Sequence, residues 1–173
     1  MTQRPASYRS GSASFELHLG SALKAILPGA FQGAVVGSLF VACYFAVNFV
    51  SQGHLAGFTD FLNLLMLFLA IVMGGTMGGI IVCALYIAAI GFPLAVLMRR
   101  QIATRAALIA ALAVATLAAL MSAYLFLQPL WAAEFEAWLI TGMALGYALP
   151  TGIAYRQAII TERMLSFWST DAD

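Results

Sequence analysis

The stretch that decides the fold is residues 61–98, FLNLLMLFLAIVMGGTMGGIIVCALYIAAIGFPLAVLM, which contains no Asp, Glu, Lys or Arg. Asp60 precedes it and Arg99 follows it. As a single helix this run would be about 57 Å long, almost twice the thickness of the hydrocarbon core of a bilayer. A run of this length and composition predicts a segment that crosses a membrane.

The composition of the whole chain points the same way. Of its 173 residues, 63% are hydrophobic and only 9% are charged. Soluble domains are usually about 45–50% apolar and about one quarter charged. Disorder is excluded because it requires low hydrophobicity and high net charge. A formal net charge of +1 without a dense basic run also disfavours a nucleic-acid partner.

Gaps between charged residues divide the chain into spans, because a spanning helix needs about 20 residues without ionised side chains. We therefore predict an all-α, polytopic membrane protein, a four-transmembrane-helix bundle over residues 28–155. The first apolar run is too long for the core of a signal peptide, so we expect it to remain as a span. The predicted spans are 28–50, 61–97, 106–128 and 135–155.

The positions of the basic residues predict the orientation. They precede the first span, follow the fourth, and occupy the loop between the second and third spans as Arg99, Arg100 and Arg105. The other two loops contain carboxylates and no Lys or Arg. Because basic loops are retained in the cytoplasm, we expect both termini to be cytoplasmic. This pattern resembles bacterial inner-membrane proteins broadly, so we expect that location.

The excess length of the second span has three possible explanations. The run can be a long tilted helix, it can break at residues 73–79 (MGGTMGG), or it can begin as an outer-surface helix capped by Thr59 or Asp60. Two full crossings would place Arg99, Arg100 and Arg105 outside, against the charge rule. We favour one kinked or tilted helix that begins in the outer interface and is bent or ended near Pro93.

Both ends of the chain have apolar residues at helical spacing. We predict a cytoplasmic tail and an interfacial helix over 1–27, and a cytoplasmic extension with a second interfacial helix over 156–173. The alternative is that both are ordinary overhangs of the membrane helices. The apolar positions are Phe15, Leu19, Ala22 and Ile26 at one end, and Ile160, Met164, Phe167 and Trp168 at the other.

Every predicted span carries small residues four positions apart, the first as a glycine zipper. In lipid, such residues let helix backbones approach closely. They can pack the bundle itself, or one face can dock a neighbouring subunit. The positions are Gly29, Gly33 and Gly37; Gly74, Gly75, Gly78 and Gly79; Ala107, Ala111, Ala115, Ala119 and Ala123; and Gly142 and Gly146.

The remaining aromatic and polar residues have structural explanations. Trp131, Trp138 and Trp168 are expected to anchor the interfaces. Glu134 and Glu136 suit a solvated helix N-terminus. His18 and His54 fall on opposite sides of the predicted membrane, so they cannot share a metal or a haem.

Cofactor and enzyme chemistry have little support in the sequence. Cys43 and Cys83 lie in separate spans without a CxxC motif and are expected to be apolar fillers. We expect no cofactor, no bound metal and no catalytic residue, because no hydrolase, metalloprotease or nucleotide-binding motif occurs. We therefore expect that the protein is not an enzyme.

Two classes of function remain. The first is a non-catalytic accessory subunit, scaffold or assembly factor of a larger membrane complex, in contact with the bilayer and with other integral-membrane subunits or a second copy of itself. The second is a small channel or facilitator without ion coupling, in which glycine-rich helices line a path. The small-residue faces and the lack of ionised groups at membrane depth favour the first.

Overall fold

The computed structural model describes residues 7–53, 57–130 and 137–170, with side chains described for 15–53, 57–125 and 140–165. These residues form helices, with no strand among them. Trp131, Glu134, Glu136 and His54 lie outside the described residues, as do the side chains of Trp138 and Trp168. The elements are α1 Ser7–Lys24, α2 Ile26–Ser51, α3 Phe58–Tyr86, a π-helical segment η1 Ile87–Gly91, α4 Phe92–Leu97, α5 Arg105–Leu130 and α6 Ala137–Thr170.

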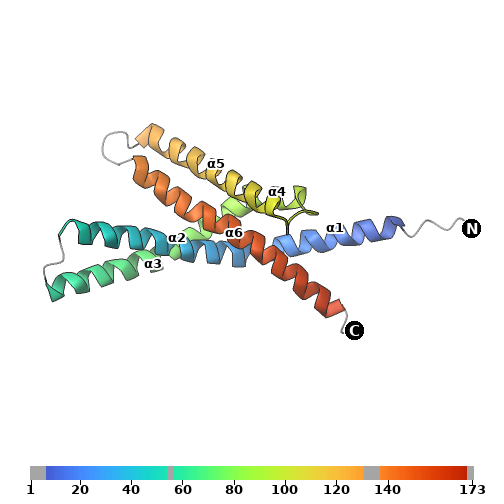
Figure 1. Cartoon of the computed structure of the whole chain (residues 1–173), viewed down its shortest axis with the longest axis horizontal. Helices are drawn as coiled ribbons and strands as arrows, with labels where there is room; N and C mark the ends of the chain where they lie inside the picture. The colour runs from blue at the N-terminus through green and yellow to red at the C-terminus, as the bar shows by residue number, and fades with distance from the viewer. Residues whose placement is uncertain (1–6, 54–56, 131–136, 171–173) are drawn as a thin grey trace, which may run out of the picture.

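Three stretches of the described chain are long and apolar enough to cross a membrane. They are Phe15–Ser51, which joins α1 to α2, Phe58–Leu97, which joins α3 to α4, and Arg105–Leu125 in α5. Figure 1 shows α2 and α3 as one hairpin and α5 and α6 as another, inclined to the first so that the two diverge toward the left of the view. The prediction of an all-helical chain is therefore confirmed for the described residues, and three of their helices could span a membrane.

The two hairpins are joined by the contact between α2 and α6. A Cβ atom added to Gly29 would lie 2.8 Å from Tyr155 Cα, and one added to Gly33 would lie 2.7 Å from Thr151 Cα. One turn further on, a Cβ on Gly37 would lie 2.5 Å from Tyr147 Cδ1. The residue numbers of the glycines increase along α2 while those of their partners decrease along α6, so the two helices are antiparallel. Their backbones are in direct contact.

Helix α3 packs on the other side of α2 through a second pair of glycines. A Cβ on Gly79 would lie 3.2 Å from the Ala34 Cβ, and one on Gly75 would lie 3.0 Å from Ser38 Oγ. The Tyr147 ring reaches into the same junction, 2.7 Å from a Cβ on Gly79. Its hydroxyl donates to the Gly75 carbonyl at 3.3 Å and lies 3.1 Å from Ser38 Oγ. Tyr147 therefore joins α2, α3 and α6 at one point.

Helix α5 packs on α6 through its alanines. Ala107, Ala115, Ala119 and Ala123 are buried, and Ala111 is half-buried. A Cβ on Gly152 would lie 3.6 Å from both the Ala111 carbonyl oxygen and the Ala115 Cβ. The alanine row thus lies where α6 presents a glycine.

The long apolar run is continuous through its glycines and changes at its far end. Residues 73–79 lie inside α3, whereas the ladder widens into the π-helical segment η1 just before Pro93. Proline lacks an N–H, and its ring clashes with the carbonyl four residues earlier, so the regular ladder cannot continue through this point. Helix α3 starts at Phe58 with Gly57 as its N-cap residue, so Thr59 and Asp60 both lie in its first turn.

The two ends of the chain differ in detail from the expectation. Helix α6 continues past Arg156 to Thr170 without a break, so the extension over 156–173 is not a separate short helix. Helix α1 is separated from α2 only by Ala25. Its buried positions are His18, Ser21 and Ala22, whereas Phe15 and Leu19 are half-buried. Polar His18 lies inward because carbonyl and guanidinium groups of other helices meet it there.

The glycine contact predicts a large difference between two substitutions in α2. Gly33→Leu should lower the thermal stability of the detergent-solubilised protein strongly, because any Cβ at this position collides with the α6 backbone. Overpacking of this kind typically costs about 1–3 kcal/mol. Val36→Leu is the control, since Val36 is 49% exposed on the lipid-facing side. Equal melting temperatures for the two variants would contradict the α2–α6 contact.

Candidate functional site

A hollow lies along α6, between α3 with η1 on one side and α5 on the other. It encloses about 460 Å³, within the range of about 300–1,000 Å³ that small-molecule sites occupy. We call it the α6 groove. Its lining is Val82, Cys83, Tyr86 and Ile90 from α3 and η1; Ala118, Ala119, Ser122 and Ala123 from α5; and Ile140, Met143, Ala144, Tyr147, Ala148 and Thr151 from α6.

Most hydroxyl groups that line the α6 groove are already hydrogen-bonded within the fold. Thr151 donates to the Tyr147 carbonyl at 2.6 Å and lies 3.1 Å from Cys83 Sγ. Ser122 donates to the Ala119 carbonyl at 2.8 Å. These groups and Tyr147 stabilise helix packing, so the groove presents a largely apolar surface.

Tyr86 is the exception. It is half-buried at the end of α3, and its hydroxyl forms no hydrogen bond with any described residue. A Cβ on Gly152 would lie 3.9 Å from this hydroxyl, so the Tyr86 side chain reaches across the groove to α6. Tyrosine hydroxyls that leave water usually find a partner. The groove therefore contains one free hydrogen-bond donor.

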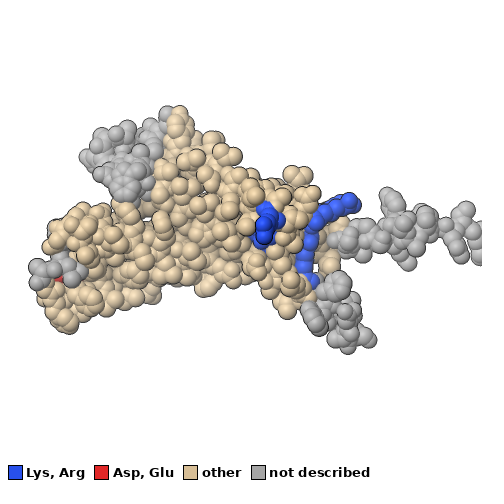
Figure 2. All heavy atoms as spheres, in the orientation of Figure 1, with Lys and Arg blue, Asp and Glu red and all other residues tan. Residues whose placement is uncertain are grey.

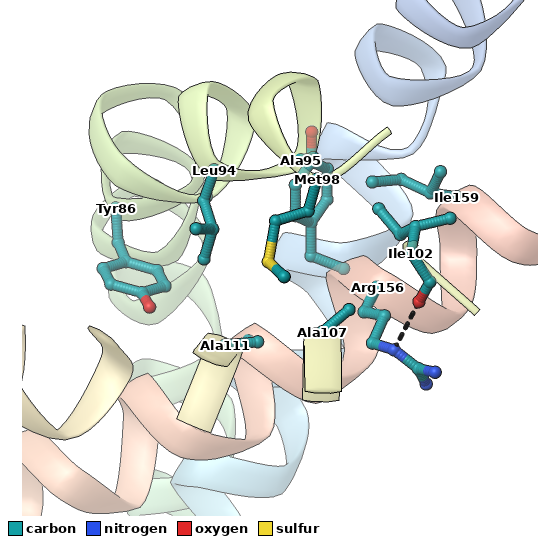
Figure 3. Close-up of a pocket in the computed structure, with 12 residues that line it drawn as sticks. Tyr86, Leu94, Ala95, Met98, Ile102, Ala107, Ala111, Arg156 and Ile159 are labelled. Carbon is teal, nitrogen blue, oxygen red and sulfur yellow. Dashed lines mark hydrogen bonds between the residues drawn. The ribbon is translucent and has the colours of Figure 1, made fainter. Parts of the chain in front are cut away.

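A smaller pocket continues from Tyr86 toward the end of the bundle that carries the arginines. It encloses about 30 Å³, room for one or two water molecules. Figure 3 shows Leu94 and Met98 pointing into it from α4 and its end, opposite Ala107 and Ala111 of α5. We call it the arginine pocket, because Arg156 lies at its edge.

Arg156 links α6 to the loop between α4 and α5. Its Nε donates to the Ile102 carbonyl at 2.8 Å, the interaction dashed in Figure 3, and an Nη donates to the Thr104 carbonyl at 3.3 Å. Thr104 Oγ1 in turn accepts from the Ala107 amide at the start of α5. Arg156, which the sequence distinguishes only by its charge, thus connects α6 to the loop that leads into α5.

His18 forms a second joint at the same end. It is 2% exposed, and its Nε2 lies 2.9 Å from the Ala95 carbonyl oxygen. Arg163 of α6 contacts His18 Nδ1 and donates to the Arg99 carbonyl at 3.0 Å. The carbonyl contact places the proton on Nε2 and leaves Nδ1 as an acceptor. Burial lowers the pKa of the Arg163 guanidinium, and these acceptors offset the cost of that burial.

Basic side chains gather at one end of the molecule. Figure 2 shows Lys and Arg near the meeting point of α1, α4 and α5, with acidic colour near the connection between α2 and α3. Arg100 and Arg105 are exposed, and neither pairs with a described carboxylate. Arg99 lies over the Phe15 ring, 5.0 Å from its centroid. This end is attractive to anions.

The small residues named from the sequence fall into two groups. Gly29, Gly33, Gly37, Gly75 and Gly79 meet neighbouring helices closely, and a Cβ on Gly146 would lie 2.6 Å from the Phe40 ring. Gly74, Gly78 and Gly142 have nothing within 4 Å of a Cβ. Periodicity cannot separate these groups, because it does not show which face meets a neighbour.

The residues that sequence reasoning missed are those that oppose the glycines. Tyr147, Thr151 and Tyr155 recur every four residues on α6, at the spacing of the glycines on α2. This matched spacing of large and small residues was a usable signal. Nothing in the sequence identified Tyr86, and His18 was considered there only as a possible ligand of a metal or a haem. Among the described side chains, no three His, Cys, Asp or Glu residues lie close enough to hold a metal ion.

The state of the tyrosine hydroxyls predicts a difference between two conservative substitutions. The Tyr155 hydroxyl donates to the Ala22 carbonyl at 3.1 Å, so Tyr155→Phe should destabilise the protein by about 1 kcal/mol. Tyr86→Phe should leave thermal unfolding in detergent unchanged, because its hydroxyl has no partner among the described residues. A comparable loss in both variants would show that Tyr86 has an acceptor within the fold.

Comparison with known proteins finds no relative of this chain. No family model matches the chain, and neither a curated protein nor a solved structure matches it. The function must therefore be argued from the contacts of this chain.

Proposed function

We propose that the protein is a non-catalytic accessory subunit or scaffold of a larger membrane complex, and that its partner is another transmembrane helix. The proposal rests on one face of α3 that the fold leaves uncovered. We call it the α3 face. It consists of Met66, Ala70, Met73, Gly74, Met77, Gly78, Ile81 and Leu85, all of which are exposed.

The two glycine pairs of α3 carry the argument. Gly75 and Gly79 meet Ser38, Ala34 and Tyr147, so they are occupied within the fold. Gly74 and Gly78 are one residue earlier, on a neighbouring side of the helix, and have nothing within 4 Å. In lipid, helices associate where small residues permit close contact. The second pair therefore supports a contact with a helix from outside this bundle.

The methionines of the α3 face support the same partner. Met77 is 75% exposed, and Met66 and Met73 are exposed to a similar extent. Methionine side chains are flexible and polarizable, and they adapt to irregular apolar surfaces. Together with the two open glycines, they form a surface suited to another apolar helix.

A channel or facilitator is less well supported. The α6 groove is large enough to admit a solute, but its walls are mostly apolar. Three of its hydroxyl-bearing residues, Ser122, Tyr147 and Thr151, direct their hydrogen bonds to helix backbones. A solute path would need such groups free for the solute.

The proposal includes the finer topology. Three stretches meet the length and hydropathy requirements for spanning, and we propose residues 135–155, mostly within α6, as the fourth span. We place both termini and the loop with Arg99, Arg100 and Arg105 in the cytoplasm, on the basis of the charge rule. A bacterial inner membrane is the proposed location.

The partner contact is tested by leucine substitutions on α3. Gly74→Leu and Gly78→Leu should each reduce the amount of partner that co-purifies in mild detergent several-fold, because leucine separates the two helices. Thermal stability of the isolated protein should not fall, since neither position meets a neighbour within the fold. Gly142→Leu is a matched control at another open glycine.

Two outcomes separate the possibilities. If the complex contains a second copy of this chain and dissociates on Gly78→Leu, the partner is the protein itself. If the complex survives both α3 substitutions, the α3 face is not the contact and the proposal fails.

The topology is tested by labelling a single cysteine in a cysteine-free background. Gln101 is exposed in the loop between α4 and α5. Ser51 is exposed at the C-terminal end of α2, which we place on the other side of the membrane. In intact cells, a membrane-impermeant thiol reagent should modify Ser51→Cys and leave Gln101→Cys unmodified until the membrane is permeabilised. The reverse pattern would invert the proposed orientation.

A further inference from the structure

We propose that the α6 groove binds one anionic phospholipid. An acyl chain lies in the groove, an ester carbonyl accepts a hydrogen bond from Tyr86, and the phosphate lies at the arginines. This site shares no residue with the α3 face, although Val82 of its lining lies one helical turn from Gly78. The inference therefore does not depend on the proposed protein partner.

The shape and surface of the groove fit a chain. Its α6 wall runs from Ile140 to Thr151, which is about 17 Å at 1.5 Å per residue. The helix walls are apolar apart from hydroxyls that are already bonded. An elongated apolar occupant removes this surface from contact with disordered lipid without leaving a buried polar group unpaired.

The Tyr86 hydroxyl specifies where the occupant must carry a hydrogen-bond acceptor. This donor has no partner among the described residues, and it points across the groove toward α5 and α6 (Figure 3). A free donor in a hydrocarbon environment is costly. Within the apolar half of a phospholipid, the ester carbonyls are the only acceptors. The carbonyl is therefore placed near Gly152, beside the Tyr86 hydroxyl.

The arginines specify the head group. Arg156 is one helical turn beyond Gly152 toward the basic end, about 6 Å along the helix axis. Its guanidinium is engaged with two carbonyls, whereas Arg100 and Arg105 are exposed and unpaired with described carboxylates. In a phospholipid the phosphate is separated from the ester carbonyl by the glycerol unit, a comparable distance. Arginine donors at this depth match a phosphate, and their number favours an anionic lipid.

The arginine pocket lies between the position of the ester carbonyl beside Tyr86 and the position of the phosphate at the arginines. At about 30 Å³ it is too small for a glycerol unit, and the Met98 side chain points into it. Met98 is unbranched and flexible, so it can move aside at small cost. Ala107 and Ala111 on the opposite side leave the space that the glycerol then fills.

The test measures lipid retained by the full-length protein. The protein is purified in mild detergent, titrated with phosphatidylglycerol or phosphatidylcholine, and analysed by native mass spectrometry. We expect one phosphatidylglycerol to be retained, with phosphatidylcholine bound several-fold more weakly. Ala118→Leu, which fills the α5 wall of the groove, should abolish retention. Ala113→Leu, an exposed α5 position outside the groove lining, should retain lipid like the wild type.

Tyr86→Phe isolates the carbonyl contact. Removal of one hydrogen bond of about 0.5–1.5 kcal/mol corresponds to a loss of affinity of about two- to tenfold. This loss should occur without a change in thermal stability in the absence of added lipid. Retention of phosphatidylglycerol by Tyr86→Phe at the wild-type level would overturn the role of the hydroxyl.

Three further results would overturn the site. Equal binding of the two lipids would remove the role of the arginines. Equal lipid retention by Ala118→Leu and Ala113→Leu would exclude the groove. Release of a protein partner by Ala118→Leu, with lipid retained, would assign the groove to a partner helix. Gly74 lies two helical turns from the nearest groove residue, so Gly74→Leu should leave lipid retention intact. Failure of this inference is therefore distinguishable from failure of the partner proposal.

Discussion

The backbone contact between α2 and α6 is the constraint on which the other helices depend. At Gly33 the approach to Thr151 is so close that even one added methyl group would overlap the α6 backbone. With the hydrophobic effect absent between helices in lipid, such close contact supplies dispersion along the stretch of α2 from Gly29 to Phe40. The α2–α6 pair then acts as a platform, with α3 on α2 and α5 on α6. The groove exists because α3 and α5 are both held by this platform and not by each other.

The general fold could be predicted from the sequence because lipid imposes simple requirements. Charge-free length indicates the helices, and small residues at four-residue spacing indicate where close contacts are possible. Which faces pair could not be predicted. Gly74 and Gly75 are adjacent and chemically identical, yet one faces open space and the other contacts Ser38 and Tyr147. That distinction depends on how α3 is rotated about its axis, which is set by the bulk of Tyr147 on another helix.

The sequence analysis used the basic residues only to predict the orientation of the chain in the membrane. In the structure, two of them, Arg156 and Arg163, also connect helices. Helix α4 ends at Leu97 with Met98 as its C-cap, which leaves carbonyl groups without helical partners. Arg156 and Arg163 donate to carbonyls of this region, and His18 lies beside another. These joints could not be derived from spacing, because the donors and acceptors are between 52 and 77 residues apart. The same arginines can therefore orient the chain and close the bundle.

In a chain without catalytic motifs, the hydrogen-bond partners of the polar side chains distinguish residues that pack the helices from residues that can bind a ligand. Three tyrosines lie at the centre of the bundle, and two of them donate to backbone carbonyls of neighbouring helices. These two bonds explain why Tyr147 and Tyr155 are tolerated in an apolar interior. Tyr86 is half-buried between the same helices and has no acceptor among the described residues. Phenylalanine would pack equally well there, so the Tyr86 hydroxyl is the group of these three that is open to an acceptor from outside the described residues.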